Sequence, residues 1–162
     1  MNQFRQFYAA DLARYQQISF WTRCFHFCLR KTQMTGNPLL KGLYHFCFRV
    51  VSNKHRMEIS YGAKIGKGFC LRDPFTVTIN SNAVVGENVT LGKNVTIGKQ
   101  NRGKSAGSPT LGNDVLIGDN AVVVGKITIG NHVAIAENAY VNRDVPDNME
   151  VFGNPAVMKQ KM

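Results

Sequence analysis

Residues 85–97 read VGENVTLGKNVTI, in which an aliphatic residue followed by glycine returns at every sixth position. The same spacing runs from Ile59 to Val141, apart from one step of eight residues and one of fourteen. A period of six fits neither a helix of about 3.6 residues per turn nor a plain alternating strand. It fits short strands joined by tight corners, three to a coil. The repeat therefore predicts a mainly β solenoid of stacked parallel strands.

The repeat also predicts which side chains face inward. An aliphatic residue heads each hexad, and a small or β-branched residue, such as Val89 or Ala121, fills a second inward slot four positions later. Asparagine and glycine collect at the corners, where a positive φ is least costly for them. Thirteen hexads make a little over four coils, and the predicted core consists of Ile59, Ile65, Leu71, Ile79, Val85, Leu91, Ile97, Leu111, Ile117, Val123, Ile129, Ile135 and Val141.

The composition divides the chain into two unlike parts. Its 162 residues are 44% hydrophobic, which excludes wholesale disorder, and carry a formal net charge of +10. Nine of the 20 Lys and Arg but only two of the ten Asp and Glu lie in residues 1–58, whereas thirteen of the fifteen glycines follow them. We expect a helical segment at 1–57 and a β-helix domain at 58–162, with a projecting loop at 99–110 and a tail at 146–162.

The first part has the pattern of amphipathic helices. Apolar side chains recur at helical spacing over residues 3–31, and the turn sequence TGNP at 35–38 ends that helix before a second one at 39–52. We expect these helices to cap one end of the β-helix and to pack within an oligomer. Because basic residues stand between the aromatic ones, a second interpretation is peripheral contact with an anionic membrane through residues 1–58.

Several classes of protein are not expected. No uncharged run reaches the roughly 18–20 residues of a membrane span, no signal peptide is apparent, and four cysteines do not form a disulfide framework, so we expect a cytoplasmic protein. A metal site is not expected, because His26 would point away from a helix face shared by Cys24 and Cys28. The hexads offer no platform for stacking bases, which argues against nucleic-acid binding.

Particular motifs resemble the hexapeptide-repeat acyltransferases. GDNAVVVGKITIG at 118–130 and the closing DVPDN at 144–148 and FGNPA at 152–156 are similar to the serine acetyltransferase branch. LRDPFTVTIN at 71–80 and TIGKQNRG at 96–103 are similar to its small members, which O-acetylate sugars during capsule and exopolysaccharide assembly. The resemblance implies a left-handed parallel β-helix, a homotrimer, acetyl-CoA as donor and a sugar or lipid-linked sugar as acceptor.

The resemblance also assigns expected roles to residues near the start of the β-helix. Asp73 stands at the position of the catalytic histidine of the family, and Glu58 at that of the carboxylate that orients it. Ser108 corresponds approximately to a second histidine of the family, which lies on the long loop. Asn101 and Arg102 of the same loop would form part of the wall of the active site. The four histidines of this chain lie elsewhere, and His55 would reach the site only if the entry strand bends.

Coenzyme A is expected to lie along the cleft between two β-helices. By resemblance, its pantetheine arm would pass Asp119 and Glu137, and its nucleotide end would meet Asn142, Arg143 and Lys159. Arg72, beside Asp73, is expected on the substrate side of the site. Val157 replaces an arginine that often follows the NPA turn in the family.

The missing histidine leaves three interpretations open. Asp73 paired with Glu58 serves as the base, because two close carboxylates raise the pKa of one of them. Alternatively, the acceptor is an amino sugar, whose free amine needs little help from a base. Otherwise the protein is a non-catalytic binding or scaffold protein. The expected function is O-acetylation of a polysaccharide sugar, and serine itself stays open as the acceptor.

Overall fold

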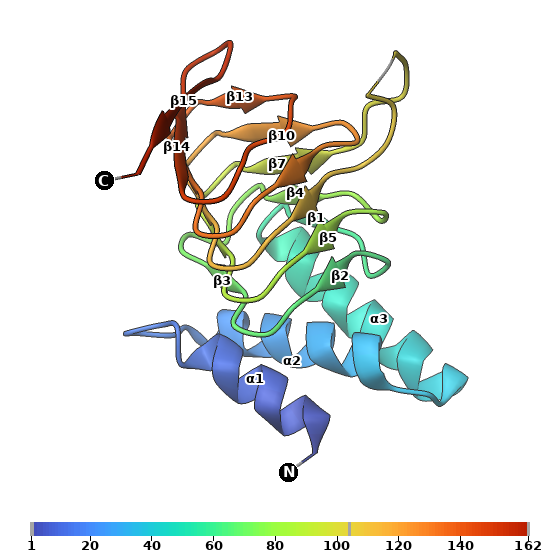
Figure 1. Cartoon of the computed structure of the whole chain (residues 1–162). Coiled ribbons are helices and arrows are strands. Elements are labelled where there is room, and N and C mark those ends of the chain that lie inside the picture. Colours follow the sequence, from blue (N-terminus) through green and yellow to red (C-terminus); the bar gives the residue numbers. More distant parts are fainter. Residues whose placement is uncertain (1, 104, 162) are drawn as a thin grey trace.

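The computed structural model describes residues 2–103 and 105–161, in which three helices precede a stack of β coils (Figure 1). The helices are α1 (Gln3–Leu12), α2 (Phe20–Met34) and α3 (Pro38–Lys54). The strands are β1 (Glu58–Ile59), β2 (Lys64–Ile65), β3 (Cys70–Leu71), β4 (Thr78–Ile79), β5 (Val84–Val85), β6 (Thr90–Leu91), β7 (Thr96–Gly98), β8 (Thr110–Leu111), β9 (Leu116–Ile117), β10 (Val122–Val124), β11 (Thr128–Ile129), β12 (Ala134–Ile135), β13 (Tyr140–Val141), β14 (Met149–Phe152) and β15 (Val157–Gln160).

Three sheets form the sides of a triangular prism. Their strand orders are β1-β4-β7-β10-β13, β11-β8-β5-β2 and β15-β14-β12-β9-β6-β3. Each strand up to β10 pairs in parallel with the strand three places later, or one coil further along, so that Ile59 lies beside Ile79 and Ile79 beside Ile97. The predicted fold class, a left-handed parallel β-helix with a helical N-terminal segment, is confirmed.

The hexad predicts the core correctly. Every predicted core residue is at most 6% exposed, and the second inward slot is equally buried at Val89 and Ala121. The corners take a positive φ at Asn88, Asn94 and Asn120, a conformation that asparagine tolerates. The same expectation is wrong for the hexad glycines such as Gly86 and Gly118, which lack a positive φ and are required because a Cβ there would meet the backbone of the next coil. Past the last hexad, Val145 forms a bridge to Ile129, and β14 then pairs with β12. These contacts extend the stack by a fifth coil, which β15 closes by folding back antiparallel to β14.

The helical segment differs from the expectation of one helix over residues 3–31. The structure ends α1 at Leu12 and starts α2 at Phe20, where the side chain of Ser19 caps the new helix by accepting a hydrogen bond from the amide of Thr22. The expected single helix is therefore wrong. The second expected helix is present as α3, capped by Asn37 and begun by Pro38.

A buried charge network joins the helices to the first coil. Arg30 of α2 and Asp11 of α1 are both completely buried, and the guanidinium donates to both carboxylate oxygens at 2.7 and 2.8 Å. The remaining guanidinium N–H groups donate to Gln33 and to the carbonyls of Ile65 and Gly66, so that all five donors are used. The helices therefore cap the end of the β-helix, as expected.

A second set of hydrogen bonds joins the helical segment to the backbone around strand β3. The amide of Phe69 donates to Asp11, and the Tyr15 hydroxyl accepts from the amide of Leu71 at 2.8 Å and lies 2.9 Å from Nε2 of His26. Burial raises the pKa of Tyr15, which keeps its hydroxyl protonated. The break between α1 and α2 places Tyr15 for these contacts.

Within residues 2–103 and 105–161, no helix is both long and apolar enough to cross a bilayer. The same residues contain no cluster of three His, Cys, Asp or Glu side chains suited to a metal ion. The four cysteines are free, and burial raises the pKa of Cys28 to about 11.

Candidate active site

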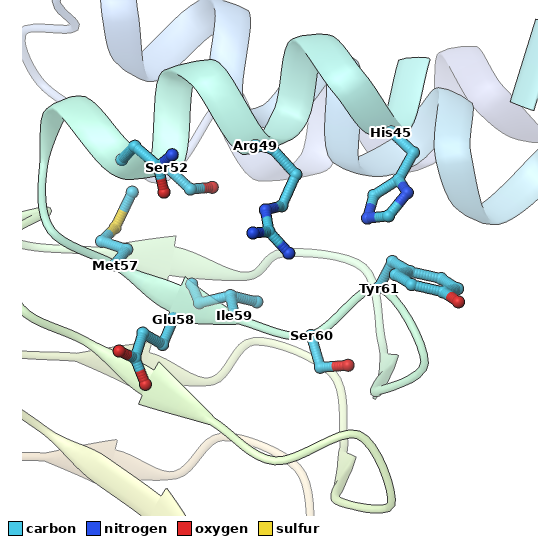
Figure 2. A pocket seen from close by; sticks show the side chains of 9 residues that line it. His45, Arg49, Ser52, Met57, Glu58, Ile59, Ser60 and Tyr61 are labelled. Carbon is cyan, nitrogen blue, oxygen red and sulfur yellow. The ribbon is translucent and has the colours of Figure 1, made fainter. Parts of the chain in front are cut away.

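A pocket of about 380 Å³ lies between helix α3 and strand β1 and is called here the α3–β1 pocket (Figure 2). Its lining residues are His45, Arg49, Ser52 and Asn53 of α3, followed by Met57, Glu58, Ile59, Ser60 and Tyr61. Figure 2 shows His45 and Arg49 extending from the helix toward the segment that carries Ile59, Ser60 and Tyr61. The pocket therefore combines a cation, a carboxylate and several hydroxyl groups.

The lining of this pocket follows from the periodicity of α3. His45, Arg49 and Ser52 stand at positions i, i+4 and i+7, which share one face of a helix. The first coil begins directly after α3, so this face lies over β1. The imidazole of His45 packs on the ring of Tyr61, with 4.3 Å between ring centroids.

Glu58 lies in β1, and Asp73 lies in the corner that precedes β4, the neighbour of β1 in the next coil. Glu58 is an exposed residue of β1, and its register partner in β4 is Thr78. Asp73 is an exposed residue of the corner that leads from β3 into β4. That corner is tied to the end of α3, because the amide of Thr76 donates to the carbonyl of His55 at 3.0 Å. Nε2 of His55 is buried there without a hydrogen-bond partner among the described residues.

The long loop ends next to Ser108, which lies near the α3–β1 pocket. Gln100 and Gly107 exchange two backbone hydrogen bonds of 2.9 Å and close a loop that projects from the coils (Figure 1). Asn101 and Arg102 are exposed within it. Past the loop, the hydroxyl of Ser108 donates to the side chain of Asn80 at 2.8 Å. Asn80 follows β4, one coil above Ser60 of the α3–β1 pocket.

A second cavity, of about 240 Å³, lies mainly over strands β9, β12 and β14 and is called here the corner groove. Arg72 lines it near the first coil, and its guanidinium pairs with Asp119 at 3.2 Å. Glu137 lies further along. The rest of the lining is mostly apolar and consists of Leu116, Gly118, Ala134, Ile135, Ala136, Glu150, Val151 and Phe152. The structure thus brings Arg72, Asp119 and Glu137 together.

The remaining predicted residues lie at the far end of the β-helix. Asn142 and Arg143 are exposed after β13, and the guanidinium of Arg143 donates to the carbonyl of Ala156. Lys159 of β15 is the register partner of Glu150, which lines the corner groove.

Sequence reasoning missed two groups of residues. One feature of the sequence could have indicated the Asp11–Arg30 pair: Asp11 is the only acidic residue before Glu58, in a segment rich in arginine. The polar face of α3 was visible as His45, Arg49 and Ser52 at helical spacing. Nothing in the sequence distinguished that face from a solvated one.

Comparison with known proteins gives consistent matches. The family model described as bacterial transferase hexapeptide (six repeats) matches residues 108–143. The putative colanic acid biosynthesis acetyltransferase WcaB of Escherichia coli is 36% identical over 145 residues, which are 85% of this chain and 85% of that protein. The serine acetyltransferase of Helicobacter pylori is 36% identical over 125 residues, which are 75% of this chain and 73% of that protein.

The fold is shared with solved serine acetyltransferases. The soybean apoenzyme superimposes with a TM-score of 0.83 at 25% identity, over 96% of this chain and 69% of that one. Some relatives are much longer: the match to the chloroplastic serine acetyltransferase 1 of Arabidopsis thaliana covers 34% of that protein.

Proposed function

Because the chain belongs to the hexapeptide-repeat acetyltransferases, the family of the serine acetyltransferases and WcaB, we propose that it transfers the acetyl group of acetyl-CoA to a sugar hydroxyl in bacterial surface polysaccharide biosynthesis. The observation that carries the choice of acceptor is the match to WcaB, which spans 85% of both chains and so extends into the helical segment. The polar lining of the α3–β1 pocket supports a sugar, because ring hydroxyls need several hydrogen-bonding partners.

The two cavities suit the two substrates of this reaction. The corner groove has a mostly apolar lining, which fits a pantetheine arm, and it includes Arg72, the residue directly before Asp73. The α3–β1 pocket is lined by Glu58, whose register partner Thr78 belongs to β4, the strand that follows the Asp73 corner. We therefore place the donor in the corner groove, with Asp119 and Glu137 beside its arm and Asn142, Arg143 and Lys159 toward its nucleotide. The acceptor occupies the α3–β1 pocket.

The reaction proposed at the corner is a direct transfer. The acceptor hydroxyl oxygen attacks the thioester carbonyl carbon, a carboxylate of Asp73 or Glu58 takes the hydroxyl proton, and the carbon–sulfur bond breaks. The proton then passes to the departing thiolate, which leaves as coenzyme A. Ser108, Asn101 and Arg102 belong to the wall of this site. The working assembly in this proposal is a cytoplasmic homotrimer.

One alternative acceptor has a specific observation in its favour. The match to the Helicobacter pylori serine acetyltransferase, at the same 36% identity, supports serine. Incubation with radiolabelled acetyl-CoA and either serine or methyl glycosides of sugars separates the two. We expect labelled sugar ester and little labelled serine. Labelled serine alone would assign the chain to serine acetylation, and a labelled amino sugar would replace the ester with an amide.

We also propose that one face of α3 contacts an anionic membrane, where lipid-linked acceptors are held. Four apolar side chains on that face are exposed: Leu39 by 84%, Leu43 by 55%, Phe46 by 67% and Val50 by 50%. No acidic residue lies between Asp11 and Glu58, whereas eight Lys and Arg do. An apolar stripe bordered only by positive charge favours anionic lipid, and two copies of the same face would repel each other.

Sedimentation with vesicles tests this contact. Phe46→Asp is expected to weaken binding to phosphatidylcholine vesicles that contain phosphatidylglycerol by about tenfold or more, because burying a phenylalanine contributes about 1.5–3 kcal/mol. Val157→Asp, at an exposed apolar residue of β15, is the matched control and should bind like the wild type. Equal binding to vesicles with and without phosphatidylglycerol would remove the membrane from the proposal.

A further inference from the structure

We infer that Arg49 makes the α3–β1 pocket selective for an acceptor sugar that carries an anionic group, a carboxylate or a phosphate. This inference rests on the proposed function, because it concerns the acceptor of the same site. It adds a property that neither the hexad repeat nor the matched proteins specify.

The first observation is that Arg49 has no acidic partner in the part of the chain that the structure describes. It forms no ion pair there with Glu58, the carboxylate that lines the same pocket. The arginine of the corner groove, Arg72, is in contrast paired with Asp119 at 3.2 Å. The Arg49 guanidinium thus extends into the pocket without an ion-pair partner among residues 2–103 and 105–161 (Figure 2).

The second observation is a buried hydroxyl in the same pocket. Ser52 is 3% exposed, lines the pocket and has an Oγ with no hydrogen-bond partner among the described residues. Because an unsatisfied buried polar group costs free energy, such groups ordinarily have a partner. A ligand hydroxyl or oxyanion in the pocket would supply one. Ser60 and Tyr61 add hydroxyl groups on the opposite wall, and Tyr61 is 50% exposed.

The third observation is the arrangement of charge. The guanidinium comes from α3, whereas the Glu58 carboxylate comes from β1 and extends from that strand away from the helix (Figure 2). A sugar that spans the pocket would place an anionic substituent on Arg49 and a hydroxyl toward Glu58. The planar fork of a guanidinium matches the oxygens of a carboxylate or phosphate, so Arg49 would fix which hydroxyl faces the corner.

Two matched pairs of sugars test the inference by calorimetry, with coenzyme A present. Methyl β-D-glucuronide and methyl β-D-glucoside differ by a carboxylate, and glucose 1-phosphate and glucose differ by a phosphate. We expect the anionic member of one pair to bind about 10- to 100-fold more tightly, the range for a hydrogen bond to a charged group. The pair that shows the difference identifies the anion.

Variants then assign the preference to Arg49. Arg49→Gln should abolish the difference within the pair, and Arg49→Lys should keep part of it. Arg5→Gln, an exposed residue of α1, is the charge-matched control and should leave it unchanged. Equal binding within both pairs, no binding of either anionic probe, or a preference that survives in Arg49→Gln would each overturn the inference.

The binding experiment does not require turnover, so the two proposals can fail separately. If the anionic sugar binds through Arg49 but no sugar is acetylated, the proposed function fails and the anion site stands. If sugars are acetylated without regard to charge, the proposed function stands and the role of Arg49 is lost.

Discussion

Asp73→Asn is expected to lower the turnover of acetyl transfer by roughly 10²-fold or more, because the substitution removes the group proposed to take the acceptor proton. The side chain is exposed in the corner between β3 and β4, next to the groove-lining Arg72, and asparagine has nearly the same shape. The KM for acetyl-CoA should change little. Steady-state measurement of coenzyme A release gives both quantities. Glu58→Gln measures the contribution of the second carboxylate.

Asp114→Asn is the matched control for this substitution. Asp114 also lies at a coil corner, with a φ of 55°, and asparagine occupies comparable corners at Asn88 and Asn120. The control should fold and turn over like the wild type. If Asp73→Asn keeps the wild-type rate, Asp73 is not the base. An unchanged rate in both carboxylate variants would instead favour an amine acceptor.

Asp11→Asn is expected to reduce the free energy of unfolding by about 3–5 kcal/mol, because it leaves the Arg30 guanidinium buried without its counter-charge. Both side chains are completely buried, and the pair connects α1 and α2 to the first coil. For a chain of this size the change corresponds to a fall in Tm of roughly 6–20 °C. Circular dichroism during urea and thermal unfolding measures both values.

Two further variants distinguish the loss of the buried Asp11–Arg30 pair from the loss of any ion pair. Glu87→Gln breaks the ion pair of Lys67 and Glu87, which are each about half exposed, and should change stability by no more than about 0.5 kcal/mol. Arg30→Met in the Asp11→Leu background removes both charges and should be less destabilised than Asp11→Asn. Equal stability of Asp11→Asn and the wild type would show that the buried pair does not hold the helices.

The Asp11–Arg30 pair also makes the free energy of unfolding depend on pH in the acid range. Burial raises the pKa of the Asp11 carboxyl, but the His26 imidazole 3.3 Å away, together with the hydrogen bonds and the charge of Arg30, outweighs burial and holds the pKa below its ordinary value. A carboxyl with a lowered pKa in the folded state contributes its full stabilisation above the unfolded pKa of about 3.9, and loses it as the pH falls through the lower folded value. Asp11→Asn should lack that part of the acid transition.

The fold was predictable because a six-residue period constrains every coil in the same way. Each inward position must be apolar to stack on the next coil, so Leu91 and Ile117 could be placed from spacing alone. The break between α1 and α2 was not predictable. Residues 13–19 keep apolar side chains at helical spacing, and the hydrogen bond from the amide of Leu71 to Tyr15 forms only when the β-helix is in place.

The candidate site was predictable in its parts and not in its arrangement. Arg72 and Asp119 were each named from a motif, but their ion pair spans 47 residues and depends on the stacking of coils. Arg49 and Ser52 could not be predicted as site residues, because polar residues on a helix are ordinarily solvated. Only the packing of α3 over β1 turns them into the wall of a pocket.

The central claim is that this chain transfers acetyl groups from acetyl-CoA to a sugar hydroxyl. The most direct test is the rate of coenzyme A thiol release with acetyl-CoA, measured separately with a panel of neutral and anionic methyl glycosides, with serine, and without acceptor. We predict release in step with the appearance of acetylated sugar, while serine leaves the rate at the acceptor-free background. Serine-dependent release with no acetylated sugar, or no release above background with any acceptor, would contradict the claim.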